Sequence, residues 1–149
     1  MPLSLDELLE RARSRIQRLT PAEAYEAARG GALIVDIRSD TDREHTGVIP
    51  GSLHVPRTVL EWRLAPDSPW RNPHVGGLER IVVVLCDHGY SSSLAAATLV
   101  DLGYSSAGDV VGGFEAWQAS GLPTVPPVRR RVPTTLAGMD APEPPSGIP

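Results

Sequence analysis

Two short apolar runs of strand length constrain the fold of this chain more than any other feature. They cover Ala32–Ile37 and Ile81–Cys86, and each is apolar at nearly every position. A strand exposed on one face alternates apolar and polar residues, whereas a strand buried on both faces of a parallel sheet does not. Shorter strand-like segments follow at 52–55 and 107–111, with helix-forming segments between them. This alternation predicts an α/β fold built on a parallel sheet.

The two ends of the chain differ in character from the middle. Near the N-terminus, apolar residues recur at helical spacing and predict an amphipathic helix over residues 4–18, within an N-terminal segment of residues 1–19. From residue 123 onward, prolines are frequent and large apolar side chains are scattered singly, so we expect a Pro-rich tail over residues 123–149 that is either flexible or draped on the domain. The remaining residues, 20–122, are enough to form one domain with its own core.

Composition excludes several classes of function. The net charge of -4 provides no basic surface for nucleic acid, and no apolar run approaches the roughly 20 residues of a membrane helix. All 14 basic residues are arginine, which excludes Schiff-base chemistry and a phosphate-binding lysine. The four histidines are scattered, and one cysteine forms no internal disulfide, so neither a metal nor a cofactor is expected. A free thiol suits a reducing compartment, which favours the cytoplasm.

The single cysteine lies where it could carry chemistry. Cys86 ends the second apolar run, a polar loop follows it, and the helix-forming segment Leu94–Val100 comes next. The N-terminus of a helix offers unpaired N–H groups and a partial positive charge, which favour a thiolate, the nucleophilic form of cysteine. Free cysteines are also among the residues most often buried for packing alone. Position by itself does not decide between these two interpretations.

The order of several short motifs along the chain resembles that of a rhodanese-like (sulfurtransferase) domain. The resemblance spans roughly residues 20–122, and it rests on an ordered set of segments: Leu33–Arg38, Glu44, Gly47–Pro56, Ile81–Cys86, Gly89, Ala95–Ala96, Leu102–Tyr104 and Val110–Trp117. It implies a three-layer fold, in which a small parallel sheet of about five strands is flanked by helices.

The same resemblance implies a reaction at Cys86. In this family the cysteine takes a sulfane sulfur from a small donor, such as thiosulfate, mercaptopyruvate or a persulfide, and a thiol or cyanide acceptor then removes it. The intermediate persulfide is anionic, and N–H donors at a helix N-terminus can stabilise that charge without a metal. The loop residues expected to bind substrate are Asp87, His88, Gly89, Tyr90, Ser91 and Ser92, with Arg38 and Arg57 as possible accessory residues.

One loop position departs from the family pattern. Active members commonly carry an arginine where this chain has Ser91. A serine hydroxyl donates one hydrogen bond but supplies no charge, which weakens the case for thiosulfate more than the case for sulfur transfer in general. His88 could replace part of the charge when protonated, whereas Asp87 would oppose thiolate formation if it lay close. Ser91, Ser92 and Ser93 could instead cap the following helix.

Other functions remain open at the level of the sequence. Without the loop arginine, the domain could be a non-catalytic binding or regulatory module. Phosphatase chemistry is disfavoured because no arginine lies between Cys86 and Gly113 to clamp a phosphoryl group. A thiol-redox sensor would need a thiol from another molecule.

Three further expectations concern packing: Arg38 pairs structurally with Asp36, Arg57 is solvated, and the tryptophans belong to the core or the pocket wall, namely Trp62, Trp70 and Trp117.

Overall fold

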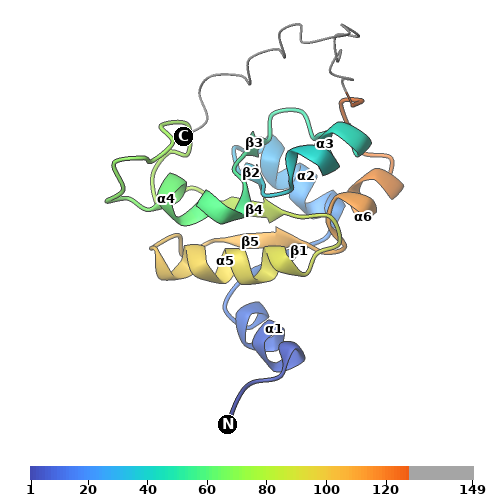
Figure 1. The fold of residues 1–149 in the computed structure, drawn as a ribbon. Coiled ribbons are helices and arrows are strands. Elements are labelled where there is room, and N and C mark those ends of the chain that lie inside the picture. The colour runs from blue at the N-terminus through green and yellow to red at the C-terminus, as the bar shows by residue number, and fades with distance from the viewer. Residues whose placement is uncertain (128–149) are drawn as a thin grey trace, which may run out of the picture.

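A five-stranded sheet forms the centre of the computed structural model, which describes residues 1–127 (Figure 1). Within these residues the strand order is β1-β5-β4-β2-β3, and every pair of neighbouring strands is parallel. The parallel α/β sheet predicted from the apolar runs is therefore confirmed. The strands are β1 (Gln17–Leu19), β2 (Leu33–Asp36), β3 (Leu53–His54), β4 (Val82–Leu85) and β5 (Gly108–Val110).

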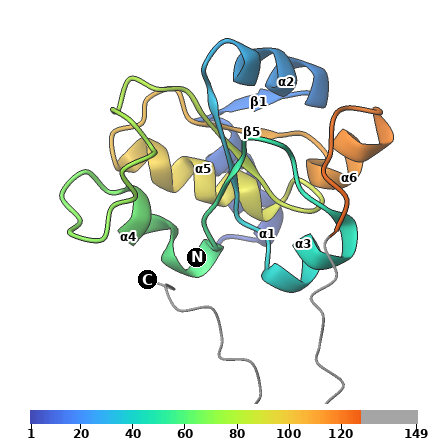
Figure 2. The ribbon, with the colours of Figure 1, turned by 90° about the horizontal axis from the view of Figure 1, so that it is seen from above.

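Helices cover both faces of the sheet. Helices α4 and α5 pack on one face and helices α2 and α6 on the other, which gives the three layers expected from the resemblance (Figure 2). The helices in the described residues are α1 (Leu5–Arg13), α2 (Pro21–Arg29), α3 (Asp40–Thr46), α4 (Leu60–Leu64), α5 (Ser91–Asp101) and α6 (Gly113–Ala119), with a 3-10 turn at Arg57–Val59.

Alternate residues of the central strands point into two separate cores. Val35 and Val84 belong to the core beneath α4 and α5. Their neighbours Ile34 and Val83 belong to the opposite core, which contains Trp117 of α6. Because helices exclude water from both faces, every residue of β2 and β4 is buried and all but Asp36 are apolar, which is the physical origin of the apolar runs.

The predicted N-terminal helix is too long. Helix α1 ends at Arg13, and Gln17–Leu19 forms strand β1, which pairs with β5 at the edge of the sheet. Ile16 packs against the core beneath α5, whereas Leu19 packs against the opposite core. A single helical stripe cannot face both sides of a sheet, so the apolar residues after Arg13 belong to the turn before β1 and to β1 itself. Both views place α1 beside α5 (Figure 1 and Figure 2).

The first residues of the predicted tail are part of the domain. Val48 and Val125 form an antiparallel bridge with backbone hydrogen bonds of 3.0 and 2.7 Å. The indole N–H of Trp117 donates to the carbonyl of Pro123 at 3.0 Å. Residues 123–127 therefore lie against the domain, as in the draped alternative, and residues 128–149 of the expected tail lie outside the described part of the chain.

Two of the three tryptophans do not occupy the core. Trp117 is buried, but Trp62 and Trp70 are 58% and 62% exposed, so the prediction for these two is wrong. In α4 the buried positions are Leu60 and Leu64, which lie one helical turn apart on the face toward the sheet. Trp62 lies midway between them and so points outward.

No helix among residues 1–127 combines the length and apolar character needed to cross a bilayer.

Candidate active site

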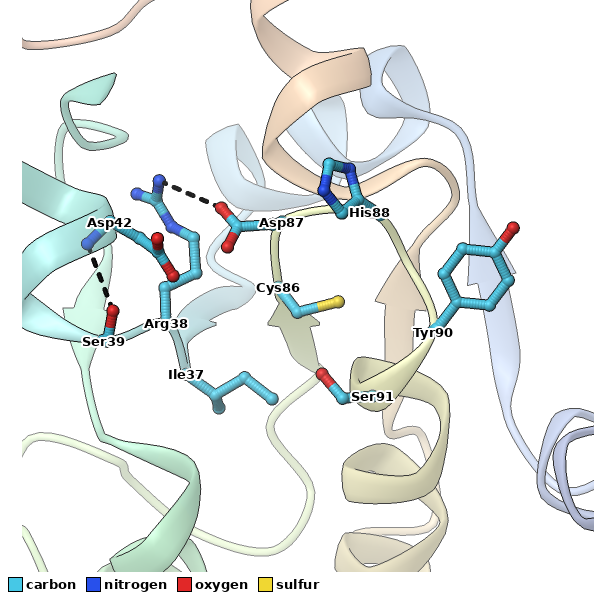
Figure 3. A pocket seen from close by; sticks show the side chains of 9 residues that line it. All are labelled: Ile37, Arg38, Ser39, Asp42, Cys86, Asp87, His88, Tyr90 and Ser91. Atoms are coloured by element: carbon cyan, nitrogen blue, oxygen red, sulfur yellow. Dashed lines mark hydrogen bonds and ion pairs between the residues drawn. The ribbon is translucent and has the colours of Figure 1, made fainter. Parts of the chain in front are cut away.

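Cys86 lies at the carboxyl end of β4, and the loop that follows leads directly into α5 (Figure 3). Its side chain is largely buried, and the backbone N–H of Gly89 donates to its sulfur at 3.1 Å. Gly89 has φ +84°, a left-handed conformation that glycine adopts without strain. The loop therefore folds back on the thiol and presents N–H donors to it.

The environment lowers the pKa of the Cys86 thiol. Burial alone raises the pKa of Cys86, but hydrogen bonds from the loop outweigh it; these come from the Ser92 and Ser91 hydroxyls and the Ser92 and Gly89 N–H groups. The Ser92 hydroxyl also donates to the Asp109 carboxylate at 2.8 Å. A hydroxyl has a single proton and cannot serve both acceptors. We therefore attribute the lowered pKa of Cys86 mainly to Ser91 and the two backbone donors.

We expect the lowered pKa of Cys86 to be visible in its reactivity. An acid with a lowered pKa ionises at lower pH, so the rate of alkylation by iodoacetamide should rise with pH around an inflection that lies at lower pH in the folded chain than in the unfolded chain. The measurement is the alkylation rate against pH, with the urea-unfolded chain as the control. Identical inflection points in the folded and unfolded chains would contradict the expectation and favour a non-catalytic module.

A pocket of about 370 Å³ opens above the sulfur. It is lined by four of the six predicted loop residues and by the accessory residue Arg38: its lining residues are Ile37, Arg38, Ser39, Asp42, Cys86, Asp87, His88, Tyr90 and Ser91 (Figure 3). Gly89 lies behind the sulfur, and Ser92 is fully buried below the loop. Arg57 does not line this pocket and instead pairs with Glu61 at 3.0 Å.

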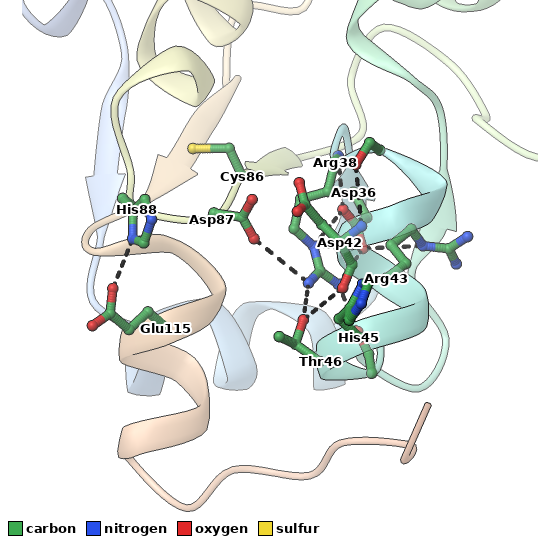
Figure 4. A network of polar contacts seen from close by, with 12 residues as sticks. Asp36, Arg38, Asp42, Arg43, His45, Thr46, Cys86, Asp87, His88 and Glu115 are labelled. Atoms are coloured by element: carbon green, nitrogen blue, oxygen red, sulfur yellow. Dashed lines mark hydrogen bonds and ion pairs between the residues drawn. The ribbon is translucent and has the colours of Figure 1, made fainter. Parts of the chain in front are cut away.

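Arg38 lines the pocket, but its charge is already engaged. Two guanidinium nitrogens donate to Asp36 at 3.0 and 2.9 Å, and both side chains are fully buried (Figure 4). The same group donates to the Gly47 carbonyl at 2.8 Å and lies 4.0 Å from the centre of the Phe114 ring. The expected structural pair is therefore present, and the guanidinium is held by the protein rather than free for an anionic substrate.

Two carboxyl groups and one imidazole lie at the mouth of the pocket. Asp87 faces Arg38, with 3.7 Å between carboxylate and guanidinium (Figure 4), and Asp42 also lines this pocket. Burial and the adjacent Asp42 raise the pKa of Asp87 above its ordinary value. His88 is mainly exposed and contacts Glu115 at 2.7 Å. Its imidazole is thus paired at the rim rather than directed at the sulfur.

The three consecutive serines have different roles. Ser91 lines the pocket, with its hydroxyl on the side of the Cys86 sulfur (Figure 3). Ser92 and Ser93 are buried, and both hydroxyls donate to the Asp109 carboxylate of β5 at 2.8 Å. None of the three makes a side-chain cap at the start of α5, so the capping alternative is wrong.

Residues distant in the sequence complete the back of the loop. Arg13 and Arg18 both donate to the Gly89 carbonyl at 2.9 Å, and Asp109 holds Arg18 and the buried serines. Asp42 of α3 joins the pocket from the opposite side. No local motif marks these residues, because each is 16 to 91 positions from its partners around the site. Among residues 1–127, no group of three or more His, Cys, Asp or Glu side chains is arranged to hold a metal ion.

Comparison with known proteins agrees with this geometry. The sequence model of the rhodanese-like domain family matches residues 20–120 of this chain. The thiosulfate sulfurtransferase GlpE of Pseudomonas savastanoi pv. phaseolicola is 34% identical over 107 residues, which are 72% of this chain and 92% of the relative. The corresponding GlpE of Pseudomonas paraeruginosa is 36% identical over 104 residues, 69% of this chain and 84% of the relative.

Solved structures with the same fold include proteins of different described function. A protein of unknown function from Rhodopseudomonas palustris, described as a possible tyrosine phosphatase, has a TM-score of 0.75 and 35% identity, covering 84% of this chain and 99% of its own. The polysulfide-sulfur transferase homodimer of Wolinella succinogenes has a TM-score of 0.63 and 26% identity, covering 79% and 84%. With the family model matching most of its described residues, this chain belongs to the rhodanese-like domain family.

Proposed function

We propose that the protein is a rhodanese-type sulfurtransferase or persulfide carrier, which moves a sulfane sulfur through a persulfide on Cys86. The observation that carries the proposal is the 3.1 Å hydrogen bond from the Gly89 N–H to the Cys86 sulfur at the base of a pocket. The lowered pKa of the Cys86 thiol supplies the thiolate that such a reaction needs. Relatives named as thiosulfate sulfurtransferases support the same class of activity.

The reaction consists of two displacements at sulfur. The Cys86 thiolate attacks the outer sulfur of the donor, and the donor's bond to that sulfur breaks with its electron pair, leaving sulfite when the donor is thiosulfate. A thiolate or cyanide acceptor then attacks the terminal sulfur of the persulfide. The Cys86 S–S bond breaks, and its electron pair restores the thiolate. Cys86 ends the cycle as it began, and any protons exchange with solvent.

The loop residues stabilise the charge at each stage. The Gly89 N–H and the Ser91 hydroxyl lie beside the sulfur and favour both the thiolate and the anionic persulfide. Asp87, His88 and Tyr90 line the entrance through which the donor must pass. Ser92 acts on the Cys86 sulfur through its backbone N–H, because its hydroxyl donates to Asp109.

The charge in the pocket bears on the choice of donor. Ser91 contributes no positive charge, and the Arg38 guanidinium is bound to Asp36. A dianion such as thiosulfate therefore meets no free guanidinium among the pocket-lining residues. We expect a persulfide to be a better donor than thiosulfate. The same lack of a free arginine argues against phosphatase activity, since phosphoryl clamping requires one.

The proposal includes the following partners and location. The donor is a small molecule, namely thiosulfate, mercaptopyruvate or a persulfide, and the acceptor is a thiol or cyanide. The domain that performs the transfer spans residues 20–122, works in the cytoplasm and binds neither nucleic acid nor a membrane surface. The net charge of -4 and the free, buried Cys86 thiol support this assignment.

Intact-mass analysis tests the proposal directly. After incubation with thiosulfate, mercaptopyruvate or a small persulfide, the protein is expected to gain the mass of one sulfur atom, and cyanide should remove it as thiocyanate. Cys86→Ser is the matched control and should gain nothing. Failure of all three donors would reject the sulfurtransferase and leave the binding module. A gain that persists in Cys86→Ser would reject Cys86 as the carrier.

A further inference from the structure

We propose that Arg13 and Arg18 are positioning residues that hold the Cys86 loop in its persulfide-binding conformation. Arg13 belongs to α1 and Arg18 to β1, and both lie outside residues 20–120, where the family model matches. The catalytic role of these two arginines rests on the sulfur transfer proposed above. Their effect on the loop conformation and on the reactivity of the thiol does not depend on it.

Both arginines bind the same carbonyl oxygen. The Nη2 atoms of Arg13 and Arg18 each lie 2.9 Å from the oxygen of Gly89, whose N–H donates to the Cys86 sulfur. A carbonyl oxygen has two lone pairs, so these two donors saturate it. Hydrogen bonds from charged donors are roughly twice as strong as neutral ones. The outer edge of the loop is therefore fixed at the residue that contacts the sulfur.

Each arginine is itself held in place by α5 or β5. The Nε of Arg13 donates to the Ser93 hydroxyl at 3.0 Å, and its guanidinium lies 5.6 Å from the centre of the Tyr90 ring. Arg18 pairs with the fully buried Asp109, with 3.1 Å between Nε and the carboxylate. These contacts join the start of α5, the sheet edge and the N-terminal segment into one support behind the loop.

The arginines also set the orientation of the Gly89–Tyr90 peptide. The described residues contain no cis peptide bond, so the Gly89 carbonyl and the Tyr90 N–H point in opposite directions across that peptide. Because the arginines bind the carbonyl on the outside of the loop, the N–H is turned away from them. The guanidinium groups also polarise the peptide and strengthen its donor end.

The same arrangement brings positive charge to the loop from outside it. Asp109 neutralises Arg18, but among residues 1–127 no carboxylate lies within ion-pair distance of Arg13. Arg13 therefore retains a net charge beside a loop in which Ser91 supplies none. Arg13 does not line the pocket, so its charge acts on the loop backbone rather than on a bound donor.

Arg13→Met is the variant that tests this inference. It removes the contacts of Arg13 with the Gly89 carbonyl and the Tyr90 ring without leaving a buried carboxylate unpaired. We expect its rate of alkylation by iodoacetamide at neutral pH to fall about 3- to 10-fold, with the thiol inflection moved to higher pH, and kcat for sulfur transfer to fall about tenfold. Arg13→Lys keeps a charged donor and should recover part of both losses. Far-UV circular dichroism establishes that each variant is folded.

Arg15→Gln is the matched control. Arg15 also ties the N-terminal segment to α5, through Asp101, but it does not touch the loop. It should leave both the alkylation profile and kcat unchanged. Wild-type values in Arg13→Met, or equal losses in Arg15→Gln, would overturn the inference. If the wild-type chain forms no persulfide, the proposed function fails instead, and the alkylation measurements still decide whether Arg13 positions the loop.

Discussion

Replacing Gly89 with alanine is expected to lower the rate of sulfur transfer by about 100-fold or more, the usual effect of losing one preorganised donor. The φ of +84° is strained for any residue with a Cβ. The added carbon would lie 2.6 Å from the Gly112 nitrogen and 3.1 Å from the Val110 carbonyl. Both are backbone atoms that cannot move independently, so the loop must shift. The Gly89 N–H would then lose its 3.1 Å contact with the Cys86 sulfur.

The stability of Gly89→Ala should also fall, by about 2–4 kcal/mol, because conformational strain and steric conflict add. Urea unfolding measures this loss, and steady-state transfer from a persulfide donor measures the rate. Gly121→Ala is the matched control, since Gly121 has φ +72° but no atom within 4 Å of the added Cβ. It should show only the conformational part of the stability loss and retain activity. Transfer within about threefold of wild type in Gly89→Ala would refute the role of this donor.

Asp36→Ala is expected to destabilise the fold by about 3–5 kcal/mol, the range typical for breaking a buried ion pair. Asp36 accepts three hydrogen-bond donors of Arg38, including its backbone N–H at 3.0 Å, and also pairs with Arg43 at 3.4 Å. Without it, the ion pair that the buried Arg38 guanidinium keeps within residues 1–127 is the longer one with Asp87, at 3.7 Å. The variant therefore leaves a buried charge without adequate compensation.

The free energy of unfolding in urea tests this expectation. Glu61→Ala breaks the partly exposed Arg57–Glu61 pair and should lose less than about 1 kcal/mol, as is usual for surface pairs. A loss in Asp36→Ala no larger than in Glu61→Ala would show that the buried pair contributes little. Since Arg38 also lines the pocket, sulfur transfer should fall together with stability.

The two variants act on opposite sides of the sulfur. Gly89 lies on the side of β5 and α6, where its carbonyl meets Arg13 and Arg18. Asp36 ends β2 and holds Arg38 at the α3 side of the pocket. The site thus depends on a rigid wall and a supported loop, and each can be tested separately.

The sequence by itself determined the class of fold and the place of the thiol. The apolar runs occur because both faces of β2 and β4 are covered by helices. Successive residues of each strand therefore pack into opposite cores, and the sequence shows this directly. The order of apolar strand, polar loop and helix likewise places Cys86 at the carboxyl end of a strand, just before the N-terminus of a helix. Ser91 stands where active members of the family commonly carry an arginine, and it lines the pocket.

Only the tertiary structure decided which distant residues support the loop. Arg13 and Arg18 lie 76 and 71 positions before Gly89, and nothing local distinguishes them from the other arginines. Periodicity reports how each residue is buried, but not which residues it meets, because pairing depends on the order of strands in the sheet. Placing β1 beside β5 brought the N-terminal arginines behind the Cys86 loop. That placement also ended the predicted helix early, since residues 17–19 bond to a strand edge far along the chain.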